Sequence, residues 1–313
     1  MRCSRTATVL AWTLGGAAGA AEPYIVIEQQ WVRPSGAEPA YTRVDDDRDG
    51  TIEGDKRSLS WSYERATSVH IGLAIDATDR IEVAASLFDS SADDRVQAPQ
   101  AGALWDILYF PGNADGEISG ALNAQAAATS TIRAWTIDAL WVHRLAESGP
   151  WRCDVAAGLR RTGMRNNFSV RYTYGAAAYR AEHLSDAVGT GIVGGVRVRR
   201  GWFEGRLGIH AEFSYAVLRG TLLGESLHYV ETNYVDIAEY GSADATFTQW
   251  DAAVGLDSEL GAGFTAMASY RIGQWGGMVS EDRFGTTLGE VETTTRDVAW
   301  DGFVAAIGWS RSF

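Results

Sequence analysis

An acidic run near the start of the chain has the residue spacing of a calcium-binding loop. The run DDDRDGTIEGDK begins at Asp45 and places Asp47 and Asp49 at alternate positions, followed by a glycine. Calcium loops use carboxylates at positions 1, 3 and 5 and a backbone carbonyl at position 7, which is Thr51 here. Lys56 stands where a glutamate should close the loop. The run predicts either a calcium site or an ordinary solvated acidic loop, and no other cofactor is expected.

The histidines form no catalytic pattern in the sequence. His183 and His228 fall in segments that read as loops, where Asp186, Ser226 or Asp236 could pair with them as in a hydrolase. General-base catalysis needs such a partner within hydrogen-bond reach. Isolated histidines in polar loops are more often solvent-exposed. We therefore expect that the chain is not an enzyme, and keep a membrane-embedded hydrolase as a remote alternative.

Composition and the first residues indicate an exported protein. Charged residues, an apolar run and small residues through Ala21 have the order of a secretory signal peptide. We expect residues 1–21 to be that signal and residues 22–313 to form a single domain. No later stretch offers the roughly 20 apolar residues of a membrane helix. The net charge of −13 argues against a nucleic-acid partner, because a phosphate-binding surface needs clustered basic residues.

Two-residue alternation of polar and apolar side chains recurs along the chain. In one run, Glu204 and Glu212 belong to a charged face, whereas Ile209 and Phe213 belong to an apolar face. Each run spans about ten residues, the length that a tilted strand needs to cross a bilayer. The runs are residues 24–32, 68–76, 80–88, 132–145, 151–162, 187–199, 204–215, 249–260, 264–273 and 300–313.

The connections between these runs are alternately short and long. The long ones are residues 33–67, 89–130, 173–186, 219–246 and 276–297. Bacterial outer-membrane barrels have short periplasmic turns, long extracellular loops and an even number of strands. The sequence thus predicts an all-β fold, a transmembrane antiparallel β-barrel of ten strands, with eight or twelve as alternatives. Twelve would follow if the apolar segment 104–110 formed an extra hairpin.

The charged side of each strand is expected to face the lumen. A basic residue facing lipid at the bilayer midplane costs about 2 to 4 kcal/mol, so charges belong inside the barrel. The residues predicted to line the lumen are Arg80, Glu82, Asp138, Arg152, Asp154, Arg160, Arg197, Glu204, Arg206, His210, Glu212, Asp251, Asp257 and Arg271.

The last strand has the phase of a membrane-insertion signal. Counting back by twos from Phe313 places Trp309, Ile307 and Phe303 on one outward face. A terminal phenylalanine that closes an alternating strand is the feature that the barrel-assembly machinery reads. We therefore expect these four residues to form that signal.

Several segments in the second half of the chain carry a family resemblance. They are Ala156–Arg160, Val188–Val196, Trp250–Glu259, Tyr270–Trp275 and the closing Gly-Trp-Ser. On these segments the chain resembles the Legionella-type major outer-membrane porin family, and Arg161 and Arg311 depart from the family pattern. The resemblance implies a pore-forming barrel.

These observations lead to one functional hypothesis and one competitor. The first is a narrow pore in the bacterial outer membrane for passive diffusion of small solutes or ions. The competitor is a non-conducting structural or adhesive barrel that displays its external loops, because about eight strands already leave an interior just filled by side chains. Expected partners are the lipid bilayer, lipopolysaccharide, the barrel-assembly machinery and small solutes.

Overall fold

The part of the chain that the computed structural model describes consists mostly of β-strands joined by short turns. The described residues are 22–36, 40–46, 54–100, 102–106, 117–118, 124–174, 177–203, 205–230, 237–284 and 291–310. Within them, no helix is long and apolar enough to span a membrane.

Ten strands form one closed antiparallel barrel. Its order is β1-β14-β13-β12-β11-β10-β9-β8-β5-β4, with the ring closed by β1 against β14 on one side and β4 on the other. The prediction of ten strands is confirmed, and the alternatives of eight and twelve are wrong. The barrel strands are β1 (Glu22–Ser35), β4 (Glu64–Ala74), β5 (Asp79–Gln97), β8 (Gln125–Ser148), β9 (Trp151–Tyr174), β10 (Ala177–Trp202), β11 (Leu207–Val230), β12 (Ile237–Gly261), β13 (Phe264–Phe284) and β14 (Val291–Ser310).

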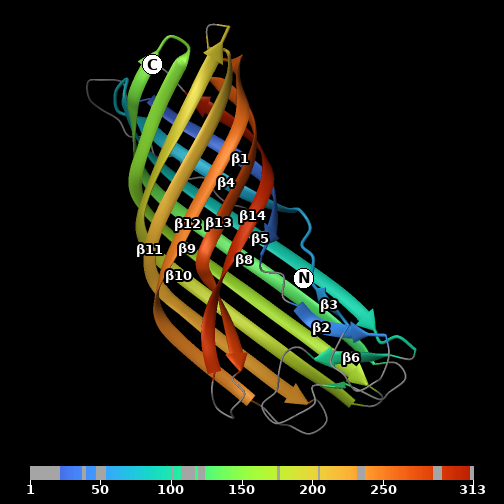
Figure 1. The fold of residues 1–313 in the computed structure, drawn as a ribbon. Coiled ribbons are helices and arrows are strands. Elements are labelled where there is room, and N and C mark those ends of the chain that lie inside the picture. Colours follow the sequence, from blue (N-terminus) through green and yellow to red (C-terminus); the bar gives the residue numbers. More distant parts are fainter. Residues whose placement is uncertain are drawn as a thin grey trace, which may run out of the picture.

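A second, small sheet lies at the end of the barrel opposite the short turns (Figure 1). Its order is β3-β2-β6-β7, and β6 contains the start of the apolar segment that could have formed an extra barrel hairpin. That segment therefore pairs outside the barrel, as far as the structure describes it. The strands are β2 (Ala40–Asp45), β3 (Asp55–Ser58), β6 (Ala103–Asp106) and β7 (Glu117–Ile118).

The short turns are stabilised locally. Between β4 and β5, the Asp76 carboxylate accepts the backbone N–H groups of Thr78 at 2.7 Å and Asp79 at 2.8 Å. These hydrogen bonds lower the pKa of the Asp76 carboxyl group below its usual range. Between β12 and β13, Gly263 has a φ of 80°, which glycine adopts without steric cost. Such turns connect adjacent antiparallel strands with few residues.

The strands extend further on the external side than the sequence predicts. The supposed loop 173–186 is mostly a hairpin, in which β9 and β10 pair out to Tyr174 and Ala177. The outer face of β5 shows why the prediction was wrong: exposed apolar residues end at Leu87, and exposed Asp89 begins a polar stretch, while pairing with β8 continues to Gln97. We call the band of exposed apolar side chains, from Ile81 to Leu87 on β5, the apolar belt. Above this belt the outer face meets water. The alternation that marks a membrane strand is therefore lost there, although the hydrogen-bonded ladder continues.

The polarity of the inner face also changes at this level. On β5, the inward residues Arg80 and Glu82 lie at the level of the belt, whereas Phe88 and Ala92 lie above it and are buried. The external half of the barrel therefore has an apolar core of the kind found in soluble proteins.

The outward phase predicted for the last strand holds for Phe303 and Ile307. Phe303 and Ile307 are 57% and 53% exposed and share the outer face of β14. Trp309 is half-buried at the rim, and Phe313 lies outside the described residues. Recognition by the assembly machinery stays a prediction.

Because the outer face is apolar where it meets lipid, we expect a charge on this face to be tolerated only above the membrane. Val83→Arg, in the middle of the exposed apolar stretch of β5, should lower the free energy of unfolding by roughly 2 to 4 kcal/mol. Ser91→Arg is the matched control, because it lies on the same face of β5 above the belt; it should change stability by less than about 0.5 kcal/mol. Urea unfolding in phosphatidylcholine vesicles would measure both, and equal costs would contradict the belt.

Candidate functional site

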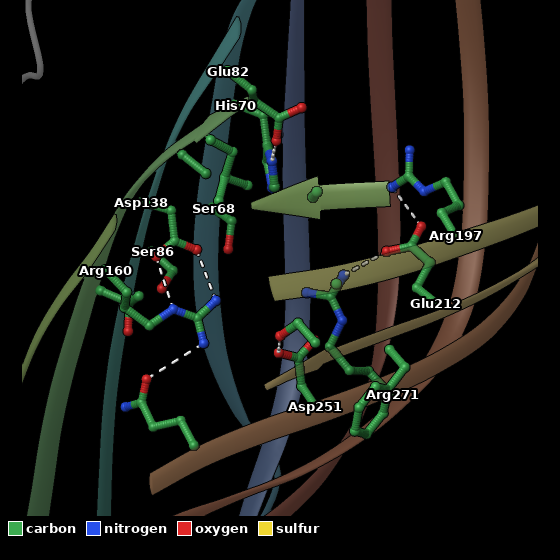
Figure 2. A pocket seen from close by; sticks show the side chains of 18 of the residues that line it. Ser68, His70, Glu82, Ser86, Asp138, Arg160, Arg197, Glu212, Asp251 and Arg271 are labelled. Atoms are coloured by element: carbon green, nitrogen blue, oxygen red, sulfur yellow. Dashed lines mark hydrogen bonds and ion pairs between the residues drawn. The ribbon is translucent and has the colours of Figure 1, made fainter. Parts of the chain in front are cut away.

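Charged side chains cross the barrel interior in one connected layer. They come from six strands on different sides of the ring, and Figure 2 shows five of them pointing toward one another. We call this group the charged layer; it consists of Glu28, His70, Glu82, Arg197, Glu212 and Arg271.

One half of the charged layer is centred on His70. Its Nδ1 lies 2.8 Å from a carboxylate oxygen of Glu82 on the next strand, β5. Its Nε2 lies 3.6 Å from Glu28 on β1. The Tyr24 hydroxyl donates to the other Glu82 oxygen at 2.6 Å. The imidazole thus joins two carboxylates from the strands on either side of it.

The other half is centred on Arg271 of β13. Its guanidinium lies 3.4 Å from Glu28 and 3.9 Å from Glu212. Glu212 also forms an ion pair with Arg197, which is its direct partner in the ladder between β10 and β11. Acidic and basic groups therefore alternate across the whole lumen. Such alternation offsets the cost of removing each charge from water.

A second polar group lies above the charged layer. Arg160 binds the Asp138 carboxylate through two nitrogens, at 2.8 and 2.7 Å, because the two residues are directly paired between β8 and β9. Gln249 accepts a hydrogen bond from Arg160 at 3.4 Å and donates to Thr162 at 3.1 Å. The bidentate geometry fixes the guanidinium plane.

Two further ion clusters lie toward the short turns. Asp154 is bound by Arg152 at 2.9 Å and by Arg80 at 3.2 Å. Asp257 is bound by Arg199 at 2.6 Å, and His210 lies 3.4 Å from it. The carboxylates are therefore already occupied by cations of this chain.

The charged layer separates two cavities within the barrel. The upper one has a volume of about 240 Å³ and is lined by Asp138, Arg160 and Trp300 among others. The lower one has a volume of about 360 Å³ and reaches Glu22 and Trp309 near the short turns. His70, Arg80, Glu82, Asp154, Arg197 and Glu212 line both cavities. A single layer of side chains thus stands between them.

Packed apolar side chains fill the interior beyond the upper cavity. They come from many strands and exclude water, with exposures of 0 or 1% for Ile132, Leu218, Phe247, Met278 and Val298. We call these five residues the apolar plug.

A bulge in β13 brings this strand into contact with β10, which is not its neighbour in the ring. The register with β14 shifts between Trp275 and Val279, and Gly277 in the bulge has a φ of 72°. Beyond it, the Ser280 backbone N–H donates to Ser185 of β10 at 2.8 Å, although β10 and β13 are not neighbours in the sheet. The His183 ring of β10 also contacts the Ser280 carbonyl, with Nε2 at 2.6 Å. These bonds link two strands that are separated by β11 and β12 in the ring.

The external mouth is closed further by the small sheet. Tyr41 of β2 is fully buried and donates to Asp94 of β5 at 2.8 Å. Burial and this hydrogen bond raise the pKa of the Tyr41 hydroxyl above its usual range. The Tyr41 carbonyl in turn accepts the hydroxyl of Tyr172, an inward residue of β9. The small sheet is therefore anchored to the inner wall.

Most of the residues expected to line the lumen do point into the two cavities. Arg206 does not: it is exposed in the turn between β10 and β11, because β11 begins only at Leu207. Glu204 lies outside the described residues. The residues that line a cavity as expected are Arg80, Glu82, Asp138, Arg152, Asp154, Arg160, Arg197, His210, Glu212, Asp251, Asp257 and Arg271.

The sequence interpretation missed several charged residues that line the interior, among them Glu28 and Arg199. Glu28 is followed by two glutamines, which hide the alternation of β1. Arg199 is the last residue of the predicted run 187–199, next to the short turn, but β10 continues through it to Trp202. In both cases, counting by twos from a confident apolar residue, such as Ile27, would have given the correct face.

The calcium prediction is not tested by the structure. Asp45 lies buried at the end of β2. Asp47, Asp49 and Thr51 lie outside the described residues. Among the residues that are described, no cluster of three or more His, Cys, Asp or Glu side chains could hold a metal ion.

One contact of the hydrolase alternative is present. His183 Nδ1 lies 2.8 Å from the Ser226 hydroxyl. Ser226 is 3% exposed, however, and the alternation of β10 puts Asp186 on the outer face, away from His183. The side chains of His228 and Asp236 are not among those described. The structure therefore brings together one pair of the proposed set, in a place closed to substrate.

Comparisons with known proteins agree on the fold. No family model and no curated protein matches the sequence. Among solved structures, the chain is similar to the outer-membrane protease OmpT from Escherichia coli, with a TM-score of 0.51, 10% identity and coverage of 95% of this chain and 99% of that one. It also matches OprG from Pseudomonas aeruginosa, with a TM-score of 0.32, 8% identity and coverage of 94% and 97%.

These likenesses bear on fold and location, not on activity. The barrel, its exposed apolar belt and the similarity to outer-membrane barrels place the chain in the bacterial outer membrane, in contact with lipid. Membership of the Legionella-type porin family stays a prediction, because no family model matches.

The charged layer predicts strong coupling between its members. Arg271→Met leaves Glu28 and Glu212 without their shared cation, so it should lower the unfolding free energy by about 3 to 5 kcal/mol. Adding Glu28→Gln removes one of the stranded charges and should restore at least half of that loss. A double-mutant cycle measured by urea unfolding in vesicles tests this coupling. Additive costs would show that the two residues act independently.

Proposed function

We propose that the chain is a non-conducting outer-membrane barrel that holds a rigid β-structured surface above the membrane. The observation that carries this proposal is the apolar plug. Ions and polar solutes lose their hydration in such a core without gaining hydrogen bonds, which makes passage unfavourable. Apolar side chains packed in this way stabilise the fold and leave no water-filled path for solutes.

The external architecture supports the same proposal. β10 pairs with β11 out to Tyr179 and Val230, well above the apolar belt on the outer faces of these strands. The small sheet adds further ordered backbone at this end. Paired strands present side chains at fixed spacing, so this end is suited to binding a macromolecular partner or to supporting the surface layer.

A narrow pore remains the second candidate, because the two cavities lie in line. They share six lining residues, four from the charged layer and two, Arg80 and Asp154, from a cluster nearer the short turns, and these side chains would have to rearrange around a solute. The mixed charges would favour small polar solutes or ions. Conduction would still require the apolar plug and the β13 bulge to move.

We do not assign catalysis to the His183 and Ser226 contact. His183 uses both ring nitrogens in contacts that link β10 to β11 and β13. His183 therefore links β10 to its neighbour β11 and to β13, which is not its neighbour in the ring.

Planar-bilayer recordings separate the two candidates. Purified, refolded protein should show no channel steps. The variant Glu212→Gln/Arg271→Gln, which neutralises the centre of the charged layer, should also show none, because the apolar plug closes the lumen independently. Heat-modifiable mobility in gels would confirm that both proteins are folded. Steps in the wild type, or steps that appear on neutralising the charged layer, would favour the pore and overturn the proposal.

A further inference from the structure

Two exposed arginines lie on the outer face where the apolar belt ends. Arg161 of β9 and Arg219 of β11 are each paired in the ladder with Thr190 of β10, which lies between them. Directly paired residues share a face, so all three side chains point outward. Two strand spacings separate the arginines by about 10 Å. We call Arg161 and Arg219 the arginine pair.

The row below the arginine pair is apolar. Two residues further down β10, Ile192 is paired with Leu159 on one side and with Val217 on the other, and all three side chains are exposed. Below them, Ala157 and Gly194 are paired with each other, and little except backbone fills the outer face there. The arginine pair therefore stands at the boundary between lipid chains and headgroups, above a shallow apolar furrow.

The arginine pair carries uncompensated positive charge. In the part of the chain that the structure describes, neither guanidinium has an ionic or hydrogen-bonding partner. The neighbouring outward arginines differ: Arg133 is bound by Asp89 at 3.0 Å, and Arg165 lies opposite Asp186 in the ladder. Unpaired arginines at the level of the headgroups attract an anion.

We infer that the arginine pair binds a phosphate of lipid A, the anchor of lipopolysaccharide. The outer leaflet of a bacterial outer membrane is built from this glycolipid, which joins phosphorylated glucosamines to several acyl chains. Guanidinium groups bind phosphate oxygens in a planar, bidentate manner. The Thr190 hydroxyl can add a hydrogen bond, and an acyl chain can lie in the furrow between Ile192 and Tyr215. The inference does not depend on whether the lumen conducts.

Binding of purified lipid A tests this inference. The full chain, refolded in a neutral detergent, would be titrated against bisphosphorylated lipid A, dephosphorylated lipid A and phosphatidylglycerol. Wild type should bind bisphosphorylated lipid A most tightly. Arg161→Gln/Arg219→Gln should raise its apparent Kd about tenfold or more, because the charge-assisted contacts are lost. The affinity of the double variant should also depend less on salt.

The matched control removes the same charge elsewhere on the surface. Arg95 faces outward on β5, six residues or roughly 20 Å of strand above Asp89, and Arg206 lies in a short turn at the other end of the barrel. Arg95→Gln/Arg206→Gln should leave the Kd within about twofold of wild type, since both sites lie beyond the range of screened charge interactions. Equal loss in the control, an unchanged Kd in the first variant, or equal affinity for either of the other two lipids would overturn the inference.

Discussion

Closure of the hydrogen-bonded ladder is the constraint on which the rest of this structure depends. Inside a bilayer no water can satisfy a backbone N–H or C=O group, so an open sheet edge is excluded. The pairing of β1 with both β14 and β4 removes the last two edges. Once the ring is closed, the pleat sends alternate side chains to lipid and to a narrow interior. The outer face must then be apolar, and every polar group of a strand must find its partner inside.

That interior is narrow enough for side chains of strands that are not neighbours in the ring to meet. Arg271, Glu28 and His70 belong to three strands and still form one chain of contacts. A buried ion pair adds little net stability, because the loss of hydration offsets most of the attraction. It does penalise other arrangements, since a shift of one residue in register would turn these charges toward lipid. The charged layer is best understood as fixing the register of the barrel.

Sequence reasoning succeeded where lipid imposes a pattern and failed where it does not. All ten membrane strands were predicted, because Leu159 or Phe213 on an outer face must alternate with polar neighbours. The strand extensions were missed because residues such as Asp89 look like loop residues once the outer face is in water. The contact between Ser280 and Ser185 could not be predicted either: it depends on a bulge that rotates one strand toward another distant in sequence. Tertiary contacts of this kind leave no periodic signal.

The reversal of polarity along each strand explains the apolar plug in physical terms. Below the external edge of the apolar belt, lipid surrounds the barrel and the charged side chains lie inside. Above that edge, water surrounds the barrel. A charged interior there would leave this half of the barrel without a hydrophobic core. A ring of strands standing in water gains stability only by burying apolar surface, as Phe88 and Phe247 do here. The plug is thus the soluble core of the external half. An apolar interior in the external half follows from the height of the barrel above the membrane, whatever binds to its external surface.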